Sequence, residues 1–145
     1  MLHTVNIAKD AFAILLAAYH KELHLLGVST VYGNAPLTKT TMNALSVLKA
    51  IGKDDIPVHP GTSKPFSREI KHAPSIHGES GLDGTNLLPQ PQRVALSHCN
   101  AIKDMRDSLM ACQPGEAWLV ATGTLTNVAL LFAVFPEVKV FATSE

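Results

Sequence analysis

The chain has 145 residues, of which 46% are hydrophobic and 17% are charged. This composition is typical of one folded domain and excludes an intrinsically disordered chain. Basic and acidic residues number 12 each, so the formal net charge is zero. A neutral chain of this kind indicates neither a nucleic acid nor an acidic membrane surface as its partner.

Two further features bear on where the protein works. The longest apolar stretch, residues 11–19, is shorter than the roughly 18 residues that a membrane-spanning helix needs. Cys99 and Cys112 match no zinc-ligand pattern; one disulfide between them is possible, but two reduced thiols are the simpler interpretation. We therefore expect a cytoplasmic protein without a membrane partner.

Helices and short strands alternate along the chain. Composition and the spacing of apolar residues predict helices over residues 10–20, 38–51, 97–111 and 124–134, and strands over residues 23–31, 56–59 and 117–121. Gly52 marks the end of the second helix. Residues 62–92 are rich in Pro and Gly and have no steady period, and a loop of this length in a compact domain is usually functional or disordered.

This order predicts an α/β fold in three layers, with a mainly parallel sheet and helices on both faces. In such sheets ligands bind beyond the carboxyl ends of the strands. Tyr32-Gly33-Asn34 and Thr122-Gly123-Thr124 each follow a predicted strand directly. We therefore expect both segments to contribute to a functional site.

The long loop contains a second group of candidate residues. His77, Glu79 and Asp83 lie there among glycines at positions 78, 81 and 84. An imidazole beside acidic groups can bind hydroxyls or transfer protons, and glycines allow a close approach to a ligand. A solvated surface turn explains the same residues equally well on chemistry alone. Zinc binding through His72, His77, His98 and Cys99 is a weaker alternative, because their spacing fits no zinc pattern.

Five segments together resemble the inosine/uridine-preferring nucleoside hydrolase family, in the order in which that family has them. In chain order they are Val31-Tyr32-Gly33-Asn34, Lys39-Thr40-Thr41-Met42-Asn43-Ala44-Leu45, Val58-His59-Pro60-Gly61 with Lys64-Pro65, Ile76-His77-Gly78-Glu79-Ser80-Gly81-Leu82-Asp83-Gly84, and Ala121-Thr122-Gly123-Thr124-Leu125-Thr126-Asn127. The resemblance extends over about residues 10–138. It implies that residues 1–145 form a partial domain, the N-terminal half of a nucleoside hydrolase fold.

The resemblance also implies a reaction. Members of this family hydrolyse the N-glycosidic bond of a ribonucleoside to give ribose and a free base, through a transition state resembling an oxocarbenium ion. A Ca²⁺ ion held by oxygen ligands binds the attacking water and the ribose hydroxyls, and a carboxylate acts as general base. The sequence does not identify the preferred nucleoside.

Four residues of this chain match residues with a role in the family. Asn34 matches an asparagine that contacts the sugar, and His77 a histidine that lines the pocket; their plainer roles are helix capping and loop packing. Asp10 matches a metal-binding aspartate, and Thr122 a threonine whose carbonyl binds the metal. Their plainer roles are a helix N-terminal carboxylate, worth roughly 0.3–1 kcal/mol, and an ordinary strand-end residue.

The N-terminal motif departs from the family pattern. The family has Asp-Pro-Gly-x-Asp-Asp where this chain reads Val5-Asn6-Ile7-Ala8-Lys9-Asp10, so valine replaces the general base and lysine replaces a metal ligand. Family members are also about twice as long. The alternative to an active hydrolase is therefore a non-catalytic truncated remnant or an interaction module. We expect such a half-domain to expose apolar surface, chiefly on the helix at 124–134, and to associate with itself.

Overall fold

The structure is a computed structural model that describes residues 2–4, 7–73, 75, 78, 80–82, 87–93, 95 and 100–141, and for residues 2–4 and 7–9 the backbone alone. The elements follow the order β1 (Leu2–Thr4), α1 (Ile7–Tyr19), β2 (Val28–Thr30), α2 (Leu37–Ala50), β3 (Val58–Pro60), α4 (Ala101–Met110), β4 (Val120–Ala121), α5 (Thr126–Val134) and the 3₁₀ helix η1 (Pro136–Val140). Strands and helices alternate as predicted.

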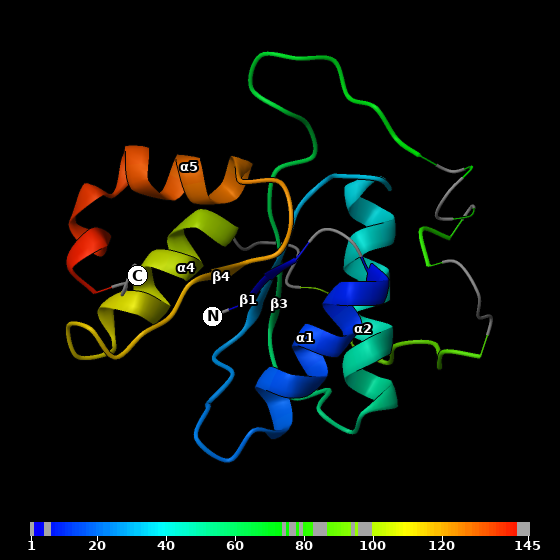
Figure 1. Cartoon of the computed structure of the whole chain (residues 1–145), viewed down its shortest axis with the longest axis horizontal. Helices are drawn as coiled ribbons and strands as arrows, with labels where there is room; N and C mark the ends of the chain where they lie inside the picture. The colour runs from blue at the N-terminus through cyan, green and yellow to red at the C-terminus, as the bar shows by residue number, and fades with distance from the viewer. Residues whose placement is uncertain are drawn as a thin grey trace.

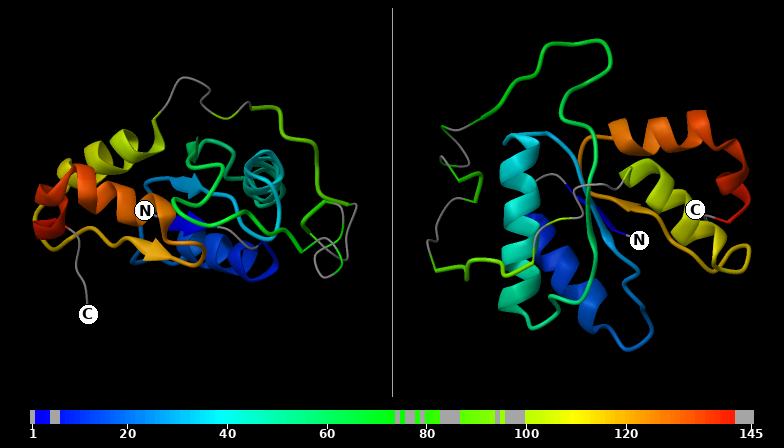
Figure 2. Two further views of the ribbon diagram at one scale, coloured as in Figure 1. Left: turned by 90° about the horizontal axis from the view of Figure 1, so that it is seen from above. Right: turned by 180° about the vertical axis from the view of Figure 1, so that it is seen from behind.

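The four described strands form one parallel sheet in the order β3-β2-β1-β4. Helices α1 and α2 lie together on one side of it, and α4, α5 and η1 lie on the other (Figures 1 and 2). The predicted three-layer α/β fold is confirmed. Because β2 and β4 flank β1 on opposite sides, the chain changes direction across the sheet at β1, which is where open α/β sheets bind ligands.

Strand β1 is the central element that the sequence pattern did not reveal. Leu2 pairs with Val28 of β2 and with Val120 of β4. A strand of three residues is too short to show a period, which explains the omission. The prediction that residues 23–31 form one strand is wrong at its start, because Leu23 is 51% exposed and only Val28–Thr30 are paired.

Two apolar clusters hold the layers together. Ile14, Val28, Leu48 and Val58 fill the space between α1, α2 and the sheet. Met105, Leu109, Leu131 and Val138 fill the space between α4, α5 and η1. Side chains in both clusters are nearly inaccessible to solvent, and burying each is worth about 1.5–3 kcal/mol.

The helix boundaries follow local chemistry. Helix α2 stops where predicted, since Gly52 has a φ of +68°, a conformation that costs glycine little. Helix α4 begins at Ala101 rather than at residue 97, because the Asn100 side chain accepts hydrogen bonds from the backbone N–H groups of Ile102 and Lys103. Helix α1 begins at Ile7, three residues before its predicted start, so Asp10 still lies in its first turn.

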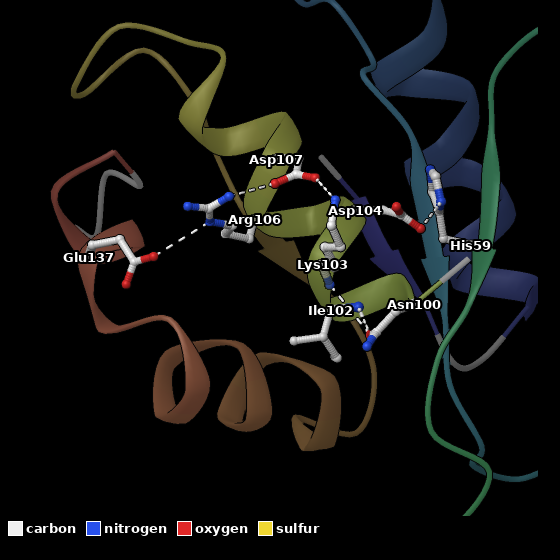
Figure 3. A network of polar contacts seen from close by, with 8 residues as sticks. All are labelled: His59, Asn100, Ile102, Lys103, Asp104, Arg106, Asp107 and Glu137. Carbon is white, nitrogen blue, oxygen red and sulfur yellow. Dashed lines mark hydrogen bonds and ion pairs between the residues drawn. The ribbon is translucent and has the colours of Figure 1, made fainter. Parts of the chain in front are cut away.

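Polar contacts tie α4 to its neighbours (Figure 3). His59 Nδ1 on β3 lies 3.0 Å from Asp104 Oδ2 on α4. Further along α4, Arg106 Nη1 lies 2.9 Å from Asp107 Oδ1 of the same helix, and Arg106 Nε lies 3.5 Å from Glu137 Oε1 of η1. The helix is thus fixed to the sheet on one side and to η1 on the other.

Exposed apolar side chains gather on α1 more than on α5. Phe12, Leu16 and Tyr19 of α1 are 75%, 61% and 58% exposed. The prediction that the helix at 124–134 carries the main exposed face is wrong in this respect, because Leu131 is fully buried against α4 and η1.

None of the helices described is long and apolar enough to cross a membrane. The Cys112 thiol is free, and Cys99 lies outside the described residues.

Candidate functional site at the carboxyl edge of the sheet

The segments that follow β2, β3 and β4 leave the sheet at the same edge, at the top in Figure 1. Thr4 of β1 pairs with Thr30 of β2, and His3 pairs with Ala121 of β4. Because the strands are parallel, the segment after β2, which leads to Asn34, and Thr122 after β4 both start at this edge. The structure therefore places two of the predicted site segments as the sequence pattern indicated.

Asn34 lies on a tightly held turn between β2 and α2. The Gly33 N–H donates to Ala35 O at 3.1 Å, and the Ala73 N–H donates to Asn34 O at 3.0 Å. Helix α2 has Pro36 at its N-cap, where no side-chain cap forms, so Asn34 lies two positions before the helix cap. Asn34 is half-buried at this turn.

The long loop returns to this turn. Asn43 Nδ2 on α2 donates to Ser80 O at 2.9 Å, and a Cβ added to Gly81 would lie 2.6 Å from the Cβ of Ala35. Gly81 also has a φ of +76°, so both its backbone and its surroundings require glycine. Residues 80–82 thus pack beside the Asn34 turn. His77, the predicted pocket residue of this loop, lies outside the described residues.

The segment after β4 is bonded directly to the segment after β2. Thr124 Oγ1 donates to Tyr32 O at 3.0 Å, and the hydroxyls of Tyr32 and Thr126 lie 2.9 Å apart in a buried contact. These contacts join the two predicted site segments although they are about ninety positions apart in the chain. Thr122 itself is exposed at the edge.

Asn127, on the first turn of α5, is completely buried beneath this edge. Its Oδ1 accepts from the N–H and the hydroxyl of Thr62, both at 2.9 Å. Its Nδ2 donates to Ser29 Oγ and to Thr30 O, both at 3.0 Å. The sequence pattern placed this residue in a motif but did not indicate that its side chain would bridge strands.

The edge is hollowed beside β3. Residues 61–66, which follow β3, line a hollow of about 360 Å³. Tyr32 N–H donates to Thr62 O at 3.0 Å, so this segment continues the pairing of β2 with β3 beyond the strands themselves.

Asp10 and Thr122, the two residues predicted to bind a metal ion, differ in their exposure to solvent. Asp10 is 1% exposed in the first turn of α1, whereas Thr122 is exposed after β4. Ca²⁺ takes six to eight oxygen ligands, and Asp10 and Thr122 supply two residues toward that number. Among the residues that the structure describes, no three His, Cys, Asp or Glu side chains form a group that could hold a metal ion. These residues therefore do not by themselves fit a calcium site.

Two residues of the N-terminal motif remain to be considered. Val5, which the family resemblance matches to the general base, is outside the described residues, and the side chain of Lys9 is not described. The weaker zinc alternative gains no support, because His72 Nδ1 contacts Gly33 O at 2.8 Å and the other candidates lie outside the described part of the chain.

Together these features define a class of protein: an open parallel α/β domain in which the segments that follow the strands and part of one long loop meet at one edge of the sheet. The family model for inosine-uridine preferring nucleoside hydrolases matches residues 7–142. The chain belongs to this nucleoside hydrolase family.

Known relatives share both sequence and structure with the chain. It is 46% identical over 131 residues to the uridine nucleosidase of Saccharomyces cerevisiae, covering 90% of this chain and 38% of the relative. It is 44% identical over 131 residues to a pyrimidine-specific ribonucleoside hydrolase of a Shewanella species, covering 88% and 39%. The solved purine-preferring ribonucleoside hydrolase from Gardnerella vaginalis superposes with a TM-score of 0.87 at 26% identity, covering 97% of this chain and 45% of that one. The chain thus spans about two fifths of the length of these relatives.

Proposed function

We propose that this protein acts on ribonucleosides, and that the reaction of its site is hydrolysis of the N-glycosidic bond to ribose and free base. The observation that carries the proposal is the direct bonding of the Tyr32 segment to the Thr124–Thr126 segment at the carboxyl edge, in a chain of this family. A relative 46% identical to the chain is called a uridine nucleosidase, which makes uridine the first substrate to test.

The residues at the edge can be assigned parts in binding. An amide both donates and accepts hydrogen bonds, so Asn34 suits adjacent ribose hydroxyls. His77, on the loop whose described residues pack beside Ala35, is proposed as a second pocket residue. Cleavage also needs a general base that takes a proton from the attacking water. Position 5, where the family resemblance puts that base, is valine and cannot perform this step, so hydrolysis by this chain requires a base from another residue.

Ca²⁺ is proposed as the cofactor, with Asp10 and the carbonyl of Thr122 as ligands in this chain. Bound calcium would supply electrostatic stabilisation for ribose hydroxyls and water. The remaining oxygen ligands must come from substrate, water or other residues. Lys9 places a positive charge one residue from Asp10 and opposes cation binding there.

Val5 and Lys9 favour a second candidate, a protein that binds ribonucleosides without cleaving them or that serves as an interaction module. Binding and cleavage need different groups: hydrogen bonds to ribose persist without a general base, whereas proton removal does not. The two candidates therefore differ in turnover while sharing the same edge.

The decisive experiment measures binding and turnover separately. Purified chain is incubated with uridine or inosine, with Ca²⁺ or with a chelator, and release of uracil or hypoxanthine is followed by chromatography. Calcium-dependent release establishes hydrolysis, and saturable binding of uridine without release establishes the second candidate. Asn34→Ala should weaken binding, whereas Asn100→Ser, which keeps an oxygen cap on the distant helix α4, should not. Absence of both binding and release would reject both candidates.

Two properties of the whole protein complete the proposal. We propose a cytoplasmic location, which is consistent with the free Cys112 thiol. We also propose that copies of the chain associate through the apolar surface of α1, where Phe12 and Leu16 are more than half exposed.

A further inference from the structure

Asn127 uses the whole hydrogen-bonding capacity of its side chain. A side-chain amide has two N–H donors and one oxygen that accepts two bonds. Here both acceptor positions are taken by Thr62, and both donors reach β2, at Ser29 and Thr30. A buried polar group held at four points has one orientation and is costly to displace.

The partners of Asn127 lie on separate pieces of the site. Ser29 and Thr30 belong to the strand that leads into the Asn34 turn, and Thr62 belongs to the segment that lines the hollow after β3. Asn127 itself follows Thr122 by five positions, on the helix that the Thr122–Thr124 segment enters. One side chain of α5 therefore connects β2 with the segment after β3, on the same helix that the segment after β4 enters.

The backbone around Asn127 is adapted to admit it. A Cβ at Gly61 would lie 2.0 Å from Asn127 Nδ2, so only glycine leaves room for the amide. Gly61 N–H and Asn127 Nδ2 both donate to Thr30 O, at 2.9 and 3.0 Å. The strand end, the glycine and the amide thus form one compact polar unit.

We propose that Asn127 is a positioning residue that sets the spacing between the Asn34 turn and the Thr122 carbonyl. The functional meaning of this spacing rests on the proposed function, in which Asn34 contacts ribose and Thr122 binds the metal. In this assignment Asn127 itself contacts neither the ribose nor the metal. It acts by fixing the two segments that carry them.

The experiment compares two substitutions on the same helix. Asn127→Leu removes all four hydrogen bonds at similar volume, and Leu131→Ala, one turn further along α5, removes core packing without touching the edge. Amide hydrogen exchange is measured by NMR at Tyr32, Gly61 and Thr62, whose N–H groups report on the edge, and at Ile51 and Lys53, which report on α2.

A positioning role predicts a local effect. In Asn127→Leu, exchange at Tyr32, Gly61 and Thr62 should accelerate at least about tenfold more than exchange at the α2 reporters, which is the effect of losing one or more buried hydrogen bonds. In Leu131→Ala the ratio between edge and α2 exchange should stay near its original value. Equal acceleration at both places in Asn127→Leu would show that Asn127 only stabilises the fold, and would overturn the proposal.

Milder variants cover the case in which Asn127→Leu does not fold. Thr62→Val removes one hydrogen bond to Oδ1, and Ser29→Ala removes one acceptor of Nδ2. Each should accelerate exchange at the edge amides selectively, and a uniform change across the protein would again overturn the proposal.

A titration with uridine tests the functional half independently. Wild-type chain should show shifts of the Asn34 amide on addition of uridine, and Asn127→Leu should weaken this binding about tenfold while Leu131→Ala leaves it within about twofold. No uridine-dependent shift in the wild type would count against the proposed function, and the exchange data would still decide whether Asn127 positions the edge. Equal weakening by both variants would overturn the positioning role.

Discussion

Gly61 shows how strongly one residue is constrained by its neighbour across the site. Its position admits no side chain, because the Asn127 amide fills the space that a Cβ would occupy. We expect Gly61→Ala to destabilise the protein by about 2–3 kcal/mol, through overpacking and the displacement of a buried amide. The free energy of unfolding in urea measures this directly.

Gly52→Ala is the matched control for Gly61→Ala. Gly52 has a positive φ but nothing within 4 Å of an added Cβ, so the control isolates backbone strain from collision. We expect it to cost about 1 kcal/mol. If the two substitutions cost the same, the close approach to Asn127 is not what requires glycine at position 61.

At the scale of elements, α4 offers a test of its charged contacts. Lys103 and, next, Arg106 donate hydrogen bonds to the Asp107 carboxylate and hold the pKa of Asp107 below its ordinary value. A carboxyl whose pKa is lower in the folded state adds stability above its unfolded pKa, about 3.9, and loses it as pH falls through the folded value. The contribution is small because the group is exposed to solvent.

We therefore expect Asp107→Asn to lower the melting temperature slightly at neutral pH and to have no effect well below the ordinary aspartate range. Melting curves of wild type and variant across this pH interval measure the difference. Lys103→Met should show the same trend, and the double variant should lose less than the sum of the two. If the melting temperatures of wild type and variant differ by the same amount at all pH values, the charge of the Asp107 carboxylate is not the cause of the difference.

The elements also show what the sequence could predict. The positions of α2 and α4 followed from apolar spacing to within a few residues, because each buries one face in a cluster, and α5 followed from its apolar composition. Strand β1 did not follow, since pairing on both sides defines it and its length gives no pattern. Strand β4 is only Val120–Ala121, both exposed, although an apolar run predicted five residues there.

The site was predictable to a similar degree. That Asn34 and Thr122 leave the same edge followed from parallel pairing and from the family resemblance. The contacts that join their segments did not follow, because Tyr32 with Thr126, and Asn127 with Ser29, are pairs that are distant in the chain and polar, with no periodic signal. Such contacts depend on the packing of α5 against the sheet, which no local pattern encodes.

At the scale of the whole molecule, four exposed apolar side chains lie on two elements: Phe12 and Leu16 on α1, and Trp118 and Val120 at β4. We call these four residues the α1–β4 face. Residues 17, 22–26, 112, 116–118 and 120 line a hollow of about 390 Å³ that joins the two elements. Strand β4 is the last strand of the described sheet on this side, and such an edge invites further pairing.

Self-association through the α1–β4 face is the result that we expect from this surface. Full burial of an exposed apolar side chain contributes about 1.5–3 kcal/mol, so Phe12→Ser combined with Leu16→Ser should weaken association at least tenfold per side chain. Sedimentation velocity over about a hundredfold range of concentration measures it, because mass action makes the dimer fraction depend on concentration. Val140→Ser, at a side chain 67% exposed on η1, removes a comparable apolar group from elsewhere and should leave association unchanged. A wild-type chain that sediments as a monomer throughout, or an equal effect of Val140→Ser, would contradict association through this face.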